Sequence, residues 1–214
     1  MKVLGINGSH RPGRGTSALL SAALQAAQDK GAQVELVELA ELNIGYCIGC
    51  NACLGKAECA LHDDMDALYA KMREADGIIL ASPDYFSNVT ARMKTFMERT
   101  RPFHMVENAL KGKVGGLVAS AGLNDCGIEE TMGVMDRWFA THEMLVVHPR
   151  LAGPVLGAGA AATQYAGYDA EKGRVRWRRV EDDEVAFATA RQLGCDMAAL
   201  IERLQGGSTS AVTA

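Results

Sequence analysis

The feature that most constrains the fold is a regular alternation of short apolar segments with longer segments of helical spacing. Strands buried on both faces appear as nearly continuous apolar runs, and the segments at 2–7 and 77–83 have this character. Strand–helix alternation of this kind predicts a parallel sheet covered by helices. The expected strands are 2–7, 33–39, 77–83, 113–122 and 144–150, and the expected helices are 16–31, 63–75, 91–100, 128–143 and 182–207.

Five strands and five helices in this order fit one α/β fold, a flavodoxin-like doubly wound five-stranded parallel sheet with strand order 2-1-3-4-5. A six-stranded Rossmann order is the alternative, but the chain has no clear sixth strand. The 214 residues suit a single domain at 1–207, with a cysteine-rich loop inserted after strand two at 43–63 and a disordered tail at 208–214. Ligands of such sheets bind at the carboxyl ends of the strands.

Composition narrows the class of partner. The formal net charge is −4 with no long run of one sign, so we expect neither nucleic acid nor a membrane as a partner. No apolar stretch is long enough to span a bilayer, and the N-terminus has no signal-peptide pattern. We therefore expect a cytoplasmic protein whose thiols stay reduced, in which six cysteines indicate metal binding or redox chemistry rather than disulfides.

The loop after the first strand, "GSHRPGRGTS" at 8–17, predicts an anion site. It leads into the first expected helix, whose terminal N–H groups are unpaired and favour negative charge. Hydroxyl groups in the loop can donate to phosphate oxygens, and Arg11 can bind them as a fork. The loop matches neither G-x-G-x-x-G nor G-x-x-x-x-G-K-S/T. The alternative is a glycine-rich turn with a Ser or Thr helix cap.

Two further loops follow strands three and four. In "SPDYFSNVTARMK" at 82–94, Tyr85 and Phe86 stand beside polar residues, a combination suited to a flat heteroaromatic ring. These two rings could instead cap the core. In "SAGLNDCGIEETM" at 120–132, small residues allow close approach of a ligand to the backbone.

These three loops together resemble the flavodoxin-like NAD(P)H-dependent FMN reductases, over about 1–204. That family has a G-S-x-R…(G/N)-T-S phosphate loop, an S-P-x-Y-(F/W) loop before a Lys-containing helix, and a Ser/Gly-rich third loop. In this chain His10 stands where the family usually has proline, and Gly15 where asparagine is common. The resemblance implies that FMN phosphate is bound by Ser9, Arg11, Thr16 and Ser17, and its ring by Pro83, Tyr85, Phe86, Asn88, Val89, Ser120 and Gly122.

Four cysteines lie within thirteen residues, as Cys47-x2-Cys50-x2-Cys53-x5-Cys59. The segment lengthens what should be a short connection, and long loops in compact domains usually have a function. Three thiols at x2 spacing open the bacterial ferredoxin motif, which favours a 4Fe-4S cluster with Cys59 as its fourth ligand. Zinc, which usually takes separated C-x2-C pairs, and no metal at all are the alternatives.

The cysteine spacing also resembles one branch of the same family, the iron–sulfur flavoproteins. This resemblance implies FMN and a 4Fe-4S cluster in each subunit. It also implies a homodimer or homotetramer in which the cluster of one subunit lies near the FMN of another.

The sequence therefore predicts a flavin-dependent oxidoreductase that passes electrons between a donor, ferredoxin or NAD(P)H, and a small-molecule acceptor. A plain NAD(P)H-dependent FMN or quinone reductase without a cluster is the alternative, and a flavodoxin-like carrier or flavin-binding regulator is a non-enzymatic one. No side chain is identified as a catalytic acid or base. The segment 152–182 carries a basic "RVRWRR" stretch and could be a lid, a subunit contact or a patch for an acidic partner.

Overall fold

A computed structural model describes residues 1–151 and 159–207 of the chain. The expected disordered tail at 208–214 and the first residues of the segment 152–182 lie outside the described residues. The elements are β1 (Lys2–Asn7), α1 (Gly15–Asp29), β2 (Gln33–Glu38), η1 (Leu39–Glu41), η2 (Ala52–Leu54), α2 (Met65–Glu74), β3 (Gly77–Pro83), α3 (Ala91–Arg99), α4 (Pro102–Met105), β4 (Val114–Ala121), α5 (Ile128–Thr141), β5 (Leu145–Val146), β6 (Ala160–Thr163), β7 (Tyr165–Asp169), β8 (Arg174–Trp177), η3 (Val180–Asp182) and α6 (Glu184–Gly207).

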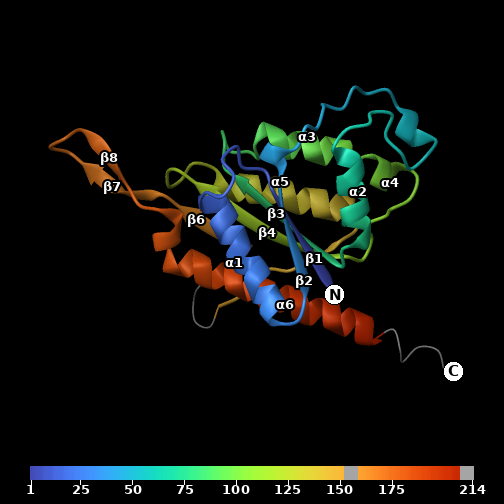
Figure 1. Ribbon diagram of the computed structural model, residues 1–214. Coiled ribbons are helices and arrows are strands. Elements are labelled where there is room, and N and C mark those ends of the chain that lie inside the picture. The colour runs from blue at the N-terminus through green and yellow to red at the C-terminus, as the bar shows by residue number, and fades with distance from the viewer. Residues whose placement is uncertain (152–158, 208–214) are drawn as a thin grey trace.

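The main sheet has the strand order β2-β1-β3-β4-β5, and every pair in it is parallel (Figure 1). This confirms the expected doubly wound order. In the register of the sheet, Leu4 of β1 lies between Glu35 of β2 and Ile78 of β3. The cysteine-rich segment follows β2, as expected.

The last position of the sheet differs from the expectation of one strand at 144–150. Strand β5 is two residues long and pairs only with Val114 and Gly115. Further along β4, strand β6 pairs in parallel with 118–121, so a sixth strand is present. Pro149 has no backbone N–H to donate, which disfavours continuation of β5 as a ladder. Two short segments thus share the edge of β4.

Helices cover both faces of the sheet. Helices α1 and α6 pack on one face, and α2, α3 and α5 pack on the other (Figure 1). The strands follow the two-residue period of a pleated sheet, because Ile78 and Leu80 enter one core cluster and Ile79 and Ala81 enter the other. This burial on both faces explains the continuous apolar runs in the sequence.

Helices α1 and α6 approach each other very closely. At Gly194 of α6, an added Cβ atom would lie 2.0 Å from the backbone oxygen of Ala23 in α1. Only a residue without a side chain fits there, so Gly194 sets the separation of the two helices. Helix α6 thereby braces the helix that leads out of the phosphate-binding candidate loop.

The side chains of Thr100, Trp138 and His142 form a buried polar cluster between α3 and α5. The Thr100 hydroxyl donates to the backbone oxygen of Met97 at 2.7 Å and accepts from Trp138 Nε1 at 3.0 Å. Because its proton is committed, the 3.0 Å contact with His142 Nε2 requires that nitrogen to donate. Burial, and then the nearby His104, lower the pKa of His142 to about 4. The imidazole is therefore neutral near pH 7.

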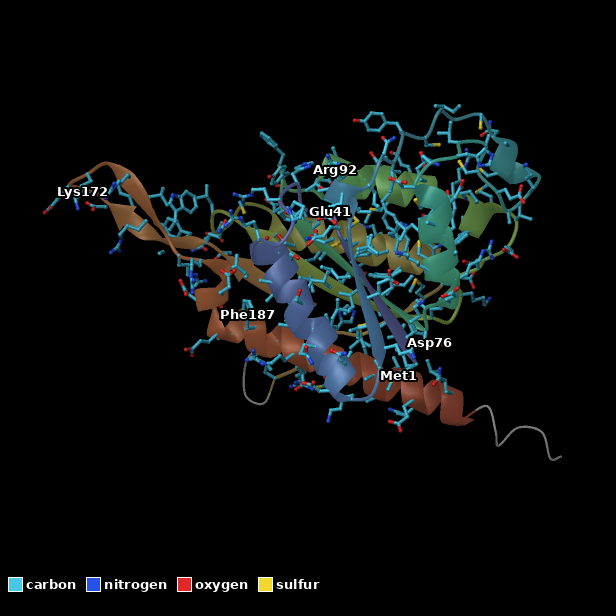
Figure 2. All side chains as sticks on the ribbon, in the orientation of Figure 1. Met1, Glu41, Asp76, Arg92, Lys172 and Phe187 are labelled. Atoms are coloured by element: carbon cyan, nitrogen blue, oxygen red, sulfur yellow. The ribbon has the colours of Figure 1, made fainter. Side chains whose placement is uncertain are left out.

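Strands β7 and β8 form an antiparallel hairpin that projects from the body of the protein, with Lys172 at its tip (Figures 1 and 2). Tyr168 and Trp177 on this hairpin are exposed. Among the described residues, no helix has the length and apolar character needed to cross a membrane.

Candidate functional site

An open cleft of about 640 Å³ lies at the carboxyl ends of β3 and β4, beside the start of helix α1. It brings all three predicted loops together with a fourth segment. The cleft is lined by Ser9, Arg11, Arg14, Gly15, Thr16, Pro83, Asp84, Tyr85, Ser120, Ala121, Gly122, Gln164, Arg178, Arg179, Val180 and Glu181.

The first loop places the start of helix α1 against this cleft. Arg14 precedes the helix and makes no side-chain cap, so the first N–H groups of the helix have no cap acceptor. This differs from the alternative of a Ser or Thr cap. The hydroxyls of Thr16 and Ser120 lie 2.7 Å apart and join the first loop to the third. Arg11 lines the cleft and makes no ion pair among the residues that the structure describes.

A buried carboxylate lies beneath the first loop. Glu38, at the end of β2, accepts a hydrogen bond from the Ser17 hydroxyl, and its other oxygen accepts from Asn7 Nδ2 at 2.7 Å. The backbone N–H of Gly13 also donates to it at 3.3 Å. Gly13 has a φ of 68°, a conformation that favours glycine. Ser17 therefore stabilises the loop through Glu38, toward which its hydroxyl is directed.

The second loop turns sharply after Pro83. Phe86 and Ser87 have φ values of 55° and 56°, and the Tyr85 N–H donates to the Asn88 carbonyl at 2.9 Å. Tyr85 lines the cleft, and its ring centroid lies 5.4 Å from that of His10. The Phe86 and Asn88 side chains are exposed and do not line the cleft. Val89, also predicted at the ring, has its side chain in the hydrophobic core.

The third loop closes the other side of the cleft. Gly122 faces Trp177 of the hairpin, because an added Cβ would lie 3.7 Å from the indole ring. Nearby, Thr131 Oγ1 donates to Asp84 Oδ1 at 2.6 Å. Burial first, and then Asp84, raise the pKa of the Cys126 thiol, which donates to the Leu123 carbonyl at 3.0 Å. Cys126 is therefore a neutral thiol within the turn.

The fourth segment, 164–181, belongs to the stretch for which the sequence left a lid, a subunit contact and a patch for an acidic partner open, and its two ends line the cleft. Its backbone is tied to the sheet, since Gln164 N–H donates to Ala121 O at 2.9 Å and Arg178 N–H donates to Gln164 O at 2.8 Å. Arg178 also pairs with Asp183 at 2.5 Å. The signal in the sequence was the basic stretch "RVRWRR", but nothing in it fixes where the hairpin returns.

The four predicted metal ligands line a second hollow, between the cysteine loop and helices α3 and α4. The loop turns at Gly49 and Asn51, which have φ values of 65° and 62°. The Leu61 N–H donates to Cys59 Sγ at 3.5 Å, and Arg101 Nη1 donates to Asn51 Oδ1 at 2.9 Å. Together with Cys47, Cys50, Cys53 and Cys59, the lining includes the buried Arg99.

The side chains that line this hollow limit the groups that it could hold. Four thiols are a complete ligand set for an iron–sulfur cluster or for zinc. Among the described residues, no three His, Cys, Asp or Glu side chains are close enough together to hold one metal ion. A single zinc ion binds all four thiolates at a Zn–S distance of about 2.3 Å, so their sulfur atoms lie close together. A cluster of several irons binds each thiolate at a different iron, so the sulfur atoms lie further apart. The four thiols therefore have the donor chemistry for either group, but among the described residues they are not gathered around one ion.

The space inside the hollow is small, about 20 Å³, which is room for about one water molecule. A cluster therefore requires the loop to move outward. The loop contains only one short 3-10 turn, η2, and its Tyr46 and Ile48 side chains are exposed. Cys53 in this turn is buried, so its packing would have to change in such a movement.

Comparison with known proteins gives three results. Residues 1–154 match the family model described as NADPH-dependent FMN reductase. An iron-sulfur flavoprotein of Methanocaldococcus jannaschii is 36% identical over 205 residues, covering 96% of this chain and 100% of that protein. An iron-sulfur flavoprotein of Methanosarcina thermophila is 32% identical over 206 residues, covering 95% and 98%.

Among solved structures, the crystal structure of RosB with a bound 8-demethyl-8-formylriboflavin-5′-phosphate intermediate is similar, with a TM-score of 0.72. The match covers 96% of this chain and 81% of that one at 19% identity. At this identity the likeness establishes the fold alone.

Proposed function

Because the chain belongs to the NADPH-dependent FMN reductase family and is therefore a flavin-dependent oxidoreductase, we propose that it carries FMN and a 4Fe-4S cluster. The proposed activity is the passage of electrons between a donor, ferredoxin or NAD(P)H, and a small-molecule acceptor. The observation that carries the proposal is the presence of two sites in one chain, the loop-lined cleft and the four-thiol hollow. The match to iron-sulfur flavoproteins over nearly the whole chain supports it.

In this proposal the cleft holds FMN. The phosphate lies at the start of helix α1, where uncapped N–H groups, the hydroxyls of Ser9 and Thr16, and Arg11 can donate to it. Ser17 contributes indirectly, because it hydrogen-bonds Glu38, which in turn accepts from the Gly13 N–H of the loop. The ring lies among Pro83, Tyr85, Ser120 and Gly122, with Phe86, Asn88 and Val89 shaping the turn beside it.

The two groups supply complementary chemistry, because a flavin exchanges electrons singly or in pairs and an iron–sulfur cluster exchanges one at a time. The contribution of the chain is to bind and orient them. The thiols of Cys47, Cys50, Cys53 and Cys59 are the ligands proposed for the cluster.

We further propose a homodimer or homotetramer. The residues described as lining the cleft and the hollow have no member in common. The cysteine loop and the β7–β8 hairpin also lie at opposite ends of the molecule in Figure 1. A second subunit that placed its hollow against the cleft of the first would shorten the electron path between the two groups.

Analysis of bound groups tests the proposal. The parent protein is purified without oxygen, and iron, acid-labile sulfide, zinc and FMN are measured per chain. Replacing any one of Cys47, Cys50, Cys53 and Cys59 by Ala should remove or convert the cluster while FMN stays bound, because the cleft is built from other residues. Cys195→Ala, in helix α6, is the matched control and should keep both groups.

Stoichiometric zinc without sulfide in the parent would contradict the cluster. It would favour the second candidate, an NAD(P)H-dependent FMN or quinone reductase without a cluster. The narrowness of the hollow, about 20 Å³, is the observation that favours this candidate. A parent without bound FMN that also fails to bind added FMN would contradict both.

A further inference from the structure

Helix α3 ends in a charged residue that is almost completely buried. Arg99 is 1% exposed and is among the largest fully buried side chains of the described residues. Burying a charge is strongly unfavourable unless the charge is paired and hydrogen-bonded. The contacts of Arg99 must therefore account for its position.

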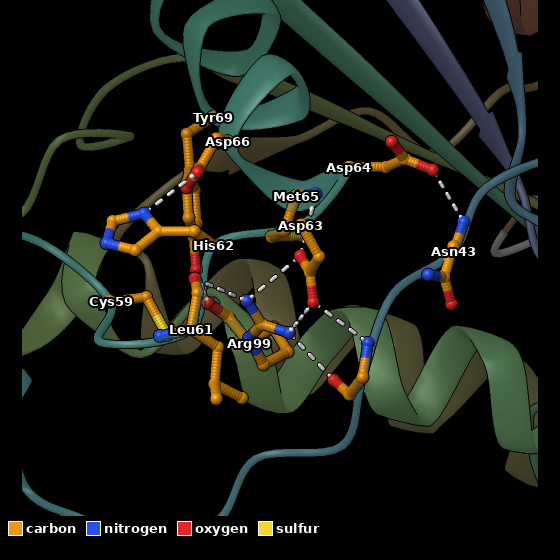
Figure 3. Close-up of polar contacts among 11 residues, drawn as sticks. Asn43, Cys59, Leu61, His62, Asp63, Asp64, Met65, Asp66, Tyr69 and Arg99 are labelled. Atoms are coloured by element: carbon orange, nitrogen blue, oxygen red, sulfur yellow. Dashed lines mark hydrogen bonds and ion pairs between the residues drawn. The ribbon is translucent and has the colours of Figure 1, made fainter.

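The hydrogen bonds of its guanidinium all go to the two ends of the cysteine loop (Figure 3). Nη1 donates to the Gly45 carbonyl at 2.8 Å and to Asp63 Oδ2 at 2.6 Å. Nη2 donates to the Leu61 carbonyl at 3.2 Å and to Asp63 Oδ1 at 3.1 Å. Gly45 precedes the first thiol and Leu61 follows the last, so one guanidinium joins both ends of the loop.

Asp63 completes the junction. Its Oδ2 also accepts from the Gly45 N–H at 3.0 Å, and its Oδ1 accepts from the Met65 N–H at 3.0 Å. Partial burial acts to raise the pKa of Asp63, but these hydrogen bonds and the Arg99 fork lower it overall. The carboxylate is therefore ionised at neutral pH and available to pair with Arg99.

Arg99 also faces the thiols. It lines the hollow together with the four cysteines, and its Nε–H is buried without an acceptor among the described residues. Burial acts to lower the pKa of Arg99, but Asp63 and the nearby Cys59 raise it above its ordinary value. A positive charge with one unused donor thus lies at the wall of a hollow lined by sulfur.

We propose that Arg99 is the positioning residue of the cysteine loop. It clamps the two ends of the loop onto helix α3 and places a fixed positive charge beside the group that the thiols hold. The inference rests on the proposed function only for the identity of that group, a 4Fe-4S cluster.

The charge has a consequence that a purely structural clamp lacks. Adding an electron to a cluster makes it more negative, so a nearby positive charge favours the reduced form and raises the reduction potential. The Asp63 carboxylate has the opposite effect. Neutralising Arg99 should lower the potential of the cluster, and neutralising Asp63 should raise it.

The clamp is tested on metal-free protein, so that the result does not depend on the cluster. Arg99→Lys keeps the charge but loses the two-pronged contact with Asp63. Cys53 is the buried thiol of the loop, so the rate at which a disulfide reagent labels Cys53 under native conditions measures opening of the loop. We expect labelling to be about tenfold faster or more, because the loss of a charge-assisted pair of hydrogen bonds favours the open loop by about that factor. Lys56→Gln, at an exposed position on the same loop, is the control and should label at the parent rate.

The charge is tested on the loaded protein by a potentiometric titration followed by electron paramagnetic resonance. Arg99→Gln keeps an N–H donor without the charge, and Asp63→Asn keeps an acceptor without the charge. The two should shift the potential in opposite directions, whereas loosening of the loop would shift both the same way. Lys56→Gln should shift it less, because an exposed charge is screened.

Each result decides one part of the proposal. An unchanged labelling rate in Arg99→Lys overturns the clamp. The role of the charge is overturned if the reduction potentials of Arg99→Gln and Asp63→Asn shift in the same direction. It is also overturned if they shift no more than the potential of Lys56→Gln. A parent without sulfide contradicts the cluster and with it the role of the charge, while the labelling still decides the clamp. If Arg99→Gln does not fold, the effect of the charge is tested by comparing the reduction potential of Asp63→Asn with that of Lys56→Gln.

Discussion

Gly15, at the start of helix α1, is where the phosphate-binding candidate loop meets the segment 164–181. An added Cβ would lie 2.4 Å from Val180 Cγ2 and 2.8 Å from Val180 Cβ. Val180 is buried, and Arg178 and Arg179, which line the cleft, directly precede it. Gly15→Ala should therefore force the turn at 178–181 away from the helix terminus.

The size of the effect follows from the overlap. Carbon atoms in contact prefer about 3.5–4.0 Å, so Val180 must move by roughly an ångström. Overpacking of this kind costs about 1–3 kcal/mol. If the turn moves outward in the free protein and must return when FMN binds, the cost falls on binding. Because about 1.4 kcal/mol is tenfold in affinity, FMN should bind about 5- to 140-fold more weakly.

The assay is a fluorescence titration of apo-protein with FMN, together with thermal unfolding of the apo-protein. Val180→Ala removes both γ carbons and should restore part of the affinity in the Gly15→Ala background. Loss of affinity that Val180→Ala does not relieve would mean that the clash with Val180 is not the cause. Unchanged affinity and unchanged unfolding temperature in Gly15→Ala would refute the reasoning altogether.

Three other variants address binding, packing and pH. Arg11→Ala should weaken FMN binding by about 1.5–3 kcal/mol, the range for hydrogen bonds to a charged group, and an unchanged dissociation constant in the same titration would remove Arg11 from the site. Gly194→Ala should lower the free energy of unfolding in urea by about 1–3 kcal/mol, whereas Gly133→Ala in helix α5, with no atom within 4 Å of the added Cβ, should raise it by up to about 1 kcal/mol. Because the pKa of His142 is lowered to about 4, the unfolded chain binds more protons between about pH 6.5 and pH 4, and stability should fall by about 3 kcal/mol as the pH drops through that window. His142→Gln should flatten that dependence in urea unfolding at several pH values, and an equally steep loss in the variant would assign it to other groups.

The sequence predicted the parts of the fold that depend on local pattern. Strands β1 and β3 are continuous apolar runs because both faces are covered, and the glycine and proline that bound β3 mark its ends. The edge of the sheet was predicted less well. Strand β6 is "AAAT", and alanine has little preference for strands, so only pairing with β4 places it.

Some residues of the candidate site could be predicted from the sequence and others could not. Arg11 and Tyr85 were predicted because each lies in a loop at the carboxyl end of a strand, and the topology alone brings these loops together. Arg178 and Arg179 could not be placed, because the return of the hairpin depends on contacts distant in sequence. Arg99 was not singled out from the sequence, because its pairing with Asp63, 36 residues earlier, depends on tertiary packing.

The position of Arg99 also bears on how the protein is made. Chains are synthesised from the N-terminus at about 5–20 residues per second, so the thiols at 47–59 emerge before helix α3 exists. Until Arg99 has been made, Asp63 and Asp64 can join the two ends of the cysteine loop through the N–H groups of Gly45 and Asn43, but the guanidinium that ties both ends to helix α3 is missing. The nascent chain therefore passes through an interval in which four thiols are open to oxidation. If these thiols hold the proposed 4Fe-4S cluster, low oxygen during biosynthesis, and not only during purification, should decide how much of the protein takes up iron.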